Sequence, residues 1–184
     1  RLDATNVIDH PALTIITPVD LDHQAFLGDT IAEIAGEKAG ILKRSVTCVV
    51  GPQHDEGLEV IEQKAARLGA PLLVYGQHWH VTTERGRLIY QDERGLLDLP
   101  LPALAGPHQI LNAGAAITAL RHLGRDEAAC HAAVTQPYWP ARMQRLTEGA
   151  LADLARPAEL WLDGGHNPAA GVMLADTLRQ HVVK

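Results

Sequence analysis

Short apolar runs alternate with amphipathic segments over the first part of the chain. Three runs, at 12–19, 45–50 and 72–75, are rich in β-branched or aliphatic residues and are bounded by proline or glycine, which is typical of buried strands. Between them, residues 30–41 and 56–68 repeat apolar side chains at helical spacing. The order strand–helix–strand–helix–strand predicts an α/β fold with a largely parallel sheet.

The pattern changes after the third run. Residues 78–99 alternate polar and apolar side chains around turns at Gly86 and Gly95, which predicts small antiparallel hairpins. Two further segments, 109–123 and 125–134, are rich in alanine and predict helices. We therefore expect a β-hairpin insert, followed by two helices that complete the first unit.

A second unit is predicted to follow a short connection. Residues 136–140 contain two prolines and two aromatic residues, which suits a stiff linker. A strand at 159–162 and a helix at 168–182 then form one βα pair. We accordingly divide the chain into 1–136, the later part of one α/β domain, and 137–184, a linker with the first βα unit of another.

Composition narrows the range of partners. The net charge is −6 and the pI about 5.9, which argues against a nucleic-acid surface. No apolar run reaches the length of a membrane span. Cys48 and Cys130 match no metal spacing, so we expect two free thiols and a reducing, cytoplasmic setting. We also expect a monomer. The chain begins at Arg1, which suggests a processed or truncated start.

The first candidate for chemistry is the pair Asp22 and His23. This pair directly follows the first predicted strand, and ligands of parallel sheets bind at the carboxyl ends of strands. A histidine there is suited to bind a metal ion or a phosphate. The alternative is a loop histidine hydrogen-bonded to the backbone.

Lys38 is the second candidate, because it lies on the apolar side of a predicted helix. At 3.6 residues per turn it falls at i+4 from Ile34 and i+7 from Ile31, in a stripe that continues to Leu42. Burying a lysine is unfavourable unless the amine is paired or neutral, and a neutral amine is a nucleophile. The alternative is that the side chain extends past the helix end into water. The first reading predicts that Lys38 points into a cleft within reach of His23.

Asp163 and His166 flank two glycines between the last predicted strand and helix. Asn167 suits the N-cap of that helix and Pro168 suits its first position. The backbone N–H groups at such a helix start can bind a phosphate or carboxylate. Asp163 and His166 would then lie at the mouth of the site. The alternative is an ordinary strand–helix turn with a good cap.

Two weaker candidates are an asparagine and an arginine. Asn112 lies near the start of the alanine-rich helix, where its amide can pair with an adenine edge or serve a structural role. Arg142 follows the linker and can clamp a phosphate or stabilise the linker. His78 and His80 lie two residues apart with no further ligand evident, which favours a surface hairpin over a metal site.

Six blocks of the sequence, taken together and in this order, resemble one enzyme family. They are Arg1-Leu-Asp-Ala-Thr-Asn6, Asp22-His23 with Phe26-Leu-Gly-Asp-Thr30, Glu37-Lys-Ala-Gly-Ile41, Asn112-Ala-Gly-Ala-Ala116, Pro140-Ala-Arg-Met-Gln144 and Asp163-Gly-Gly-His-Asn-Pro168. The family is folylpolyglutamate synthase/dihydrofolate synthase, in the Mur ligase superfamily. The resemblance implies a partial parallel-sheet ATPase domain of the Mur ligase type, followed by the start of a Rossmann-like C-terminal domain, cut short at both ends.

The resemblance also implies an activity. Such enzymes use ATP and Mg²⁺ to add L-glutamate to dihydropteroate or to folates. The substrate carboxylate attacks the γ-phosphate to form an acyl phosphate, and the amine of glutamate then displaces phosphate. The alternatives are a peptidoglycan-precursor ligase of the same superfamily and a nucleotide-binding module without catalysis. A dinucleotide-dependent oxidoreductase is disfavoured, because no G-x-G-x-x-G follows any predicted strand.

Residue roles follow from the resemblance, one position at a time. His23 matches a magnesium-binding histidine, and Lys38 matches a lysine that is often carbamylated. Carbamylation converts an amine into a carboxylate, which suits a buried position near magnesium. His166 matches a residue near the γ-phosphate and the incoming glutamate. Asp3 lies near the folate site.

The nucleotide contacts implied by the resemblance are an adenine contact at Asn112, a phosphate contact at Arg142 and a ribose or nucleotide contact at Asp163. Ala141 stands where glycine is common in the family, and Gly165 where alanine is common. The phosphate loop of the family, G-x-x-x-x-G-K-[ST], matches nowhere in the sequence. We therefore expect this stretch of chain alone to be inactive in ATP turnover.

Overall fold

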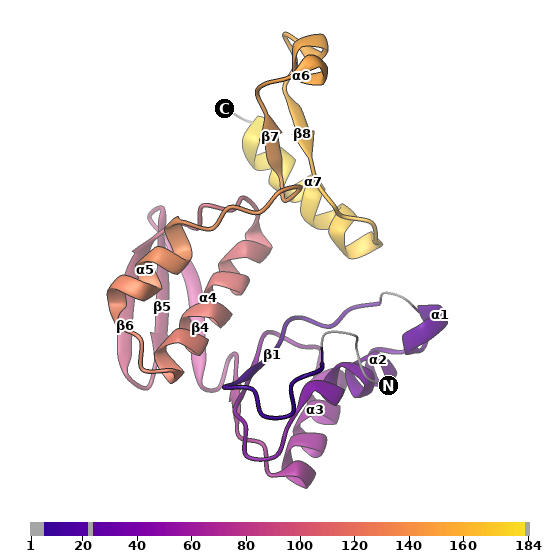
Figure 1. The fold of residues 1–184 in the computed structure, drawn as a ribbon, viewed down its shortest axis with the longest axis vertical. Coiled ribbons are helices and arrows are strands. Elements are labelled where there is room, and N and C mark those ends of the chain that lie inside the picture. Colours follow the sequence, from indigo (N-terminus) through magenta and orange to yellow (C-terminus); the bar gives the residue numbers. More distant parts are fainter. Residues whose placement is uncertain (1–5, 22–23, 183–184) are drawn as a thin grey trace.

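A computed structural model describes residues 6–21 and 24–182 of the chain (Figure 1). The elements in chain order are β1 (Thr14–Ile16), α1 (Gln24–Leu27), α2 (Ile31–Lys38), a 3-10 turn (Ala39–Ile41), β2 (Cys48–Val50), α3 (Asp55–Leu68), β3 (Leu72–Val74), β4 (Trp79–Glu84), β5 (Arg87–Asp92), β6 (Gly95–Pro100), α4 (Pro107–His122), α5 (Glu127–Thr135), β7 (Gln144–Leu146), α6 (Ala150–Ala155), β8 (Leu160–Leu162) and α7 (Pro168–Val182).

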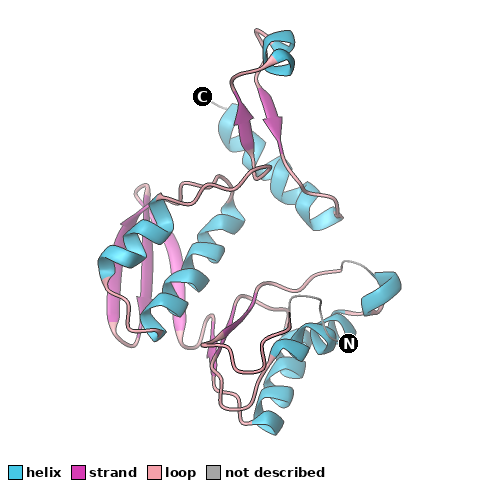
Figure 2. Ribbon diagram, in the orientation of Figure 1, coloured by secondary structure: helices cyan, strands magenta, loops and turns pink. Residues whose placement is uncertain are grey.

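The first three strands form a parallel sheet in the order β1-β2-β3, as the sequence predicts. Cys48 of β2 pairs with Thr14 on one side and Leu72 on the other. Helices α2 and α3 lie side by side along one face of this sheet (Figure 2). The fold is therefore a mixed α/β architecture built on a parallel sheet.

Two hydrophobic cores meet at strand β2. Its side chains alternate, because successive residues of a strand point to opposite faces. Cys48 and Val50 pack in the core shared with α2 and α3, whereas Val49 packs in the core shared with α4 and the second sheet. One face of the parallel sheet is thus covered by α2 and α3, and the other is covered at β2 but exposed at Ile15 of the edge strand β1.

The second sheet is an antiparallel meander, β4-β5-β6, that confirms the hairpins predicted for residues 78–99. Trp79 at its start is fully buried and its indole N–H donates to the Leu73 carbonyl of β3 at 3.0 Å. The Tyr90 hydroxyl lies 2.9 Å from the Thr118 hydroxyl of α4. These bonds join the meander to the parallel sheet on one side and to α4 on the other.

Helix α4 approaches β4 closely at Gly114. A Cβ atom at this position would lie 2.6 Å from the ring of Trp79 and 2.7 Å from the side chain of Val81. Such distances are far below van der Waals contact, so only glycine allows the helix to pack this near the strand. The small residues of this helix therefore serve packing.

The last unit departs from the sequence prediction of a single βα pair. Strand β7 pairs antiparallel with β8, and α6 lies between them in the chain. Strand β7 was missed because it is three residues long and mostly polar, so it has no apolar run to signal it. The four-residue helix α1, within the loop expected between 20 and 29, was missed because it is too short to show a period.

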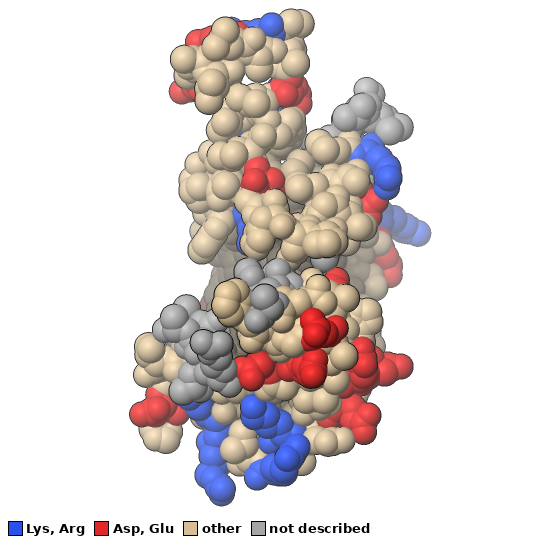
Figure 3. Space-filling model, turned by 90° about the vertical axis from the view of Figure 1, so that its right-hand side faces the viewer, with Lys and Arg blue, Asp and Glu red and all other residues tan. Residues whose placement is uncertain are grey.

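Both cysteines are free, as the composition predicts, and both are buried. Burial raises the pKa of the Cys48 thiol and that of the Cys130 thiol. On the face drawn in Figure 3, acidic and basic side chains gather mainly on the lower part of the molecule, next to one another. That face therefore carries no single broad basic surface.

Gly114→Ala is expected to lower the free energy of unfolding by about 1–3 kcal/mol, because the added methyl group overpacks the contact with Trp79 and Val81. Gly171→Ala is the matched control, since this glycine of α7 has no heavy atom within 4 Å of the position of a Cβ. There the better helix propensity of alanine should raise stability by about 0.5–1 kcal/mol. Equal effects of the two substitutions in urea unfolding would contradict the close packing described for α4.

Candidate functional site

The start of helix α4 carries a short chain of side-chain hydrogen bonds. Asn112 Nδ2 donates to Gln109 Oε1 at 3.0 Å, and Gln109 Nε2 lies 2.9 Å from His108 Nε2. Gln109 is only 6% exposed, whereas Asn112 lies at the surface. The predicted adenine-contacting residue is thus held from behind by a buried amide.

The loop after β8 is fastened by one carboxylate to residues 141–143, which follow the linker. Asp163 Oδ2 accepts a hydrogen bond from the Met143 N–H at 2.8 Å, and Asp163 Oδ1 accepts one from the Gly165 N–H at 2.7 Å. The Gly164 N–H also donates to the Ala141 carbonyl at 2.8 Å. Asp163 therefore has a clear structural task, which is to hold the glycine loop against the segment that carries Arg142.

Helix α7 begins as the sequence predicts. Asn167 Oδ1 accepts from the Ala170 N–H at 2.8 Å, which is the N-cap bond, and Pro168 is the first helical residue. His166 is exposed just before the cap, with Nδ1 3.1 Å from the Gly164 carbonyl oxygen. The helix start and the exposed histidine together form the open side of this loop.

Arg142 is exposed between two residues with left-handed backbone conformation. Ala141 has φ 56° and Met143 has φ 45°, values that cost a residue with a Cβ about 1–2 kcal/mol each. The Met143 side chain is buried, and the Asp163 bond to its N–H helps to hold this turn. The turn projects the guanidinium of Arg142 away from the packed core.

His108 shows that the candidate nucleotide contacts lie near one another. Burial lowers the pKa of this half-buried imidazole, the positive charge of Arg142 lowers it further, and Asp163 opposes the shift. Both charged groups must therefore lie close enough to act on a residue at the start of α4. Arg142 and Asp163 thus share the surroundings of His108, which lies four residues before Asn112 on the same helix.

Helix α7 packs against the same place. The Thr177 hydroxyl of α7, which donates to the Met173 carbonyl at 2.7 Å, lies 3.1 Å from where a Cβ of Gly106 would be. Gly106 has φ 120° and immediately precedes α4. The nucleotide candidates accordingly sit where α4, the linker and α7 converge.

The prediction that Lys38 lies on a buried face is wrong. Ile34 and Leu42 of the predicted stripe are buried, but Lys38 is exposed. Helix α2 ends at Lys38 and the chain tightens into the 3-10 turn at Ala39–Ile41, so no further α-helical turn extends the packed face beyond it. Its long stem lets the amine reach the surface. The argument for a reactive amine from burial therefore fails, and only the resemblance supports a role.

The segment around Lys38 is tied to two other blocks of the resemblance. Asn6 Nδ2 donates to the Gly40 carbonyl at 3.1 Å, which joins the first block to the third. Thr30 and Glu33 form a capping box at the start of α2, and hydrogen bonds from the backbone of Asp29 and from Thr30 lower the pKa of Glu33. The predicted positions Asp3 and His23 lie outside the described residues.

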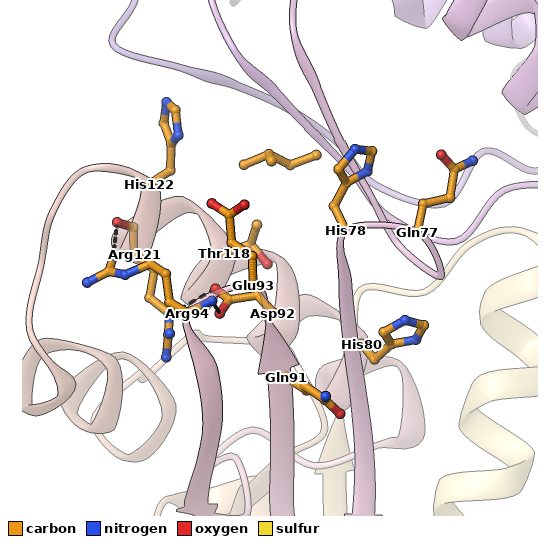
Figure 4. A pocket seen from close by; sticks show the side chains of 11 residues that line it. Gln77, His78, His80, Gln91, Asp92, Glu93, Arg94, Thr118, Arg121 and His122 are labelled. Atoms are coloured by element: carbon orange, nitrogen blue, oxygen red, sulfur yellow. Dashed lines mark hydrogen bonds and ion pairs between the residues drawn. The ribbon is translucent and has the colours of Figure 1, made fainter.

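The structure has a pocket of about 490 Å³ at the other end of α4 (Figure 4). Its lining residues are Leu73, Gln77, His78, His80, Gln91, Asp92, Glu93, Arg94, Thr118, Arg121 and His122. No site residue predicted from the sequence lies here, although His78 and His80, for which a surface hairpin is predicted, line the pocket.

The charges at the back of this pocket are already paired. Arg121 Nε lies 2.9 Å from Asp92 Oδ2, and the Arg121 guanidinium sits 5.8 Å from the centroid of the Tyr90 ring. Arg94 donates to the Arg121 carbonyl at 2.6 Å. Burial raises the pKa of Tyr90. These contacts stabilise the junction of β5, β6 and α4, and they single out no class of ligand.

Among residues 6–21 and 24–182, no group of three or more His, Cys, Asp or Glu side chains is arranged to hold a metal ion. Within the same ranges, no helix has the length and apolar character needed to cross a membrane.

The chain is similar in sequence and in fold to known proteins. No protein-family model matches the sequence. The Bacillus subtilis dihydrofolate synthase/folylpolyglutamate synthase is 32% identical over 200 residues, covering 98% of this chain and 42% of that protein. A solved structure of E. coli FolC in complex with DHPP and ADP matches with a TM-score of 0.82 at 30% identity, covering 97% of this chain and 40% of its own. An FPGS–AMPPCP–folate complex matches with a TM-score of 0.80 at 30% identity, covering 97% and 44%.

This chain is a homologue of the folylpolyglutamate and dihydrofolate synthases. The sequence resemblance is thereby confirmed, along with the mixed α/β fold that it implies. The chain spans about two fifths of the length of the relatives that it matches.

The left-handed backbone at position 141 gives a physical reason why glycine is common there in the synthase family. Ala141 stands where the resemblance expects glycine, and its φ of 56° is a conformation that glycine adopts without strain. At Gly165 the reverse holds, since a Cβ there would lie 2.9 Å from Ala170 Cβ and 3.0 Å from Asp163 Oδ1. Gly165 therefore leaves room for the carboxylate that fastens the loop.

Ala141→Gly should raise the free energy of unfolding by about 0.5–1 kcal/mol, because relief of the left-handed strain exceeds the entropy that glycine adds to the unfolded chain. Ala132→Gly, in the interior of α5, is the control and should lower stability by about 1 kcal/mol. If thermal unfolding shows both variants destabilised alike, the strain assigned to the Arg142 turn is absent.

Proposed function

We propose that this chain serves in an ATP-dependent carbon–nitrogen ligase that adds L-glutamate to dihydropteroate or to folates. The observation that carries the proposal is the likeness in sequence and fold over 97–98% of the chain to enzymes with these names. One relative binds DHPP and ADP, and another binds AMPPCP and folate. A carboxylate would take the γ-phosphate of ATP to form an acyl phosphate with release of ADP, and the amine of glutamate would displace phosphate as the amide forms.

The junction at α4 supports a nucleotide role. Asn112 offers an amide at the surface, Arg142 is exposed on a strained turn, and that turn is hydrogen-bonded to Asp163. An arginine is suited to neutralise phosphate charge, and an amide can pair with an adenine edge. We assign Asn112 to the adenine, Arg142 to a phosphate, Asp163 to the ribose or nucleotide, and His166 to the region of the γ-phosphate.

Several parts of the proposal rest on the resemblance alone. These are magnesium held by His23, carbamylated Lys38 and the folate contact of Asp3. We also propose a domain boundary between 136 and 137 from the composition of the linker, a cytoplasmic location from the two free cysteines, and a monomeric state. The described residues form no magnesium-binding group by themselves. No step of the reaction is therefore assigned to the metal here.

The proposed activity has a direct test in the whole protein. Release of ADP and phosphate should require a pteroate or folate acceptor together with L-glutamate, and mass spectrometry should find the acceptor one glutamate heavier. The control omits glutamate. Consumption of ATP with a muramyl-peptide substrate, and none with folates, would instead favour a peptidoglycan-precursor ligase.

Lys38→Ala should lower the turnover of the whole enzyme by about 10- to 100-fold, the usual effect of losing a group that orients a metal ion or its ligands. Folding should be unaffected because Lys38 is exposed. The nearby Lys43→Ala serves as the control for loss of one positive charge and should stay close to the wild-type rate. A short-chain carboxylate is expected to restore part of the lost rate. Normal activity of Lys38→Ala would leave this lysine as a surface residue only.

A further inference from the structure

The polar side chains at the start of α4 form a chain whose proton arrangement can be deduced. The amide nitrogen of Gln109 has two protons and no lone pair available to accept. Its contact of 2.9 Å with His108 Nε2 therefore requires that the imidazole nitrogen accept. A neutral imidazole that accepts at Nε2 carries its proton at Nδ1.

The other end of the Gln109 amide orients Asn112. Gln109 Oε1 accepts from Asn112 Nδ2 at 3.0 Å, which turns the Asn112 carbonyl oxygen away from Gln109. Asn112 then presents one acceptor and one remaining N–H at the surface. This is the pattern that pairs with the amino group and ring nitrogen of an adenine edge.

Because Gln109 is buried, its amide cannot reverse without changing the orientation of Asn112. Its side chain is 6% exposed, so it cannot exchange one partner for water when it turns over. If the Gln109 amide were reversed, its oxygen would face His108 and its N–H groups would face Asn112. Asn112 would then have to reverse as well, and it would no longer match adenine.

We propose that His108 is a positioning residue that fixes, through Gln109, the amide orientation of Asn112 for an adenine base. This inference rests on the nucleotide role proposed above and adds the residue that sets base preference. His108 acts from beneath the site, because it contacts Gln109 and not the base. It therefore affects base preference through Gln109 and Asn112 without contacting the base.

The surroundings of His108 keep it in the accepting form. In this tautomer Nδ1 already carries a proton, so a second proton would have to be added at Nε2, opposite the N–H of Gln109 and on a half-buried ring. Arg142 from the linker disfavours a positive charge on the ring, Asp163 after β8 favours one, and α7 contributes only the hydroxyl of Thr177 nearby. Burial and Arg142 outweigh Asp163, so the pKa of His108 is lowered.

Protonation of His108 should reverse the chain. An imidazolium has two donors and no acceptor, so it would face the Gln109 N–H with another N–H. Gln109 would turn its oxygen to His108, and Asn112 would lose its acceptor. Affinity for adenine nucleotides should therefore fall as the pH drops below the lowered pKa of His108.

The test measures binding of ADP and GDP to the whole protein by calorimetry across pH. The wild type should prefer ADP, and His108→Phe, which keeps a ring but has no acceptor, should lose about tenfold of that preference at neutral pH. His108→Gln places an amide oxygen where Nε2 lies, so it should restore the preference but not its pH dependence. His131→Phe, at an exposed position of α5, is the control for loss of a histidine and should bind like the wild type.

The outcomes separate this inference from the proposed function. If the wild type binds no adenine nucleotide, the proposed function fails and the inference fails with it. If the wild type prefers ADP and His108→Phe keeps both the affinity and the preference, only the inference is overturned.

A second measurement needs no variant. Carbon and nitrogen NMR shifts of the His108 ring in the wild type should show a neutral imidazole with its proton on Nδ1. A proton on Nε2 at neutral pH would mean that Gln109 is reversed, which would overturn the inference even if His108→Phe did not fold.

Discussion

The close approach of α4 to β4 at Gly114 is the constraint on which the rest of the molecule depends. Because Gly114 has no Cβ, the helix lies directly against Trp79, whose indole N–H is hydrogen-bonded to the parallel sheet. One helix therefore fixes the distance between two sheets. It also positions two regions, since its second turn carries Asn112 and its last turn lines the pocket that contains Arg121. A shift of α4 would move both ends together because a helix is rigid along its axis.

The second organising contact is the carboxylate of Asp163, which joins segments twenty residues apart through the N–H groups of Met143 and Gly165. Hydrogen bonds to an ionised acceptor are stronger than neutral ones. The same charge also acts on His108, so it links the glycine loop with the start of α4. A structural role and a nucleotide role for Asp163 are thus compatible, because the residue that shapes the loop also sets the charge around the site.

The sequence predicted the parallel strands and the antiparallel insert because their apolar periods are clear, and it predicted the cap of α7 because Asn167 and Pro168 have specific positional preferences. It could not predict β7, whose residues are held mainly by pairing with β8. The helical wheel also failed at Lys38, since a wheel assumes that the helix continues and α2 ends there. The role of His108 depends on side chains from three distant segments, which no local pattern records.

The turn that carries Arg142 explains why strain is tolerated at this site. Two left-handed residues, Ala141 and Met143, would relax readily in an isolated peptide, because each carries a Cβ that disfavours the conformation. Here the Ala141 carbonyl accepts from Gly164, the Met143 N–H donates to Asp163, and the Met143 side chain is buried. These contacts over-determine the backbone on either side of Arg142, so the strain persists. The guanidinium of Arg142 is therefore exposed on a rigid backbone. Binding an anion there costs less conformational entropy than it would on a flexible loop.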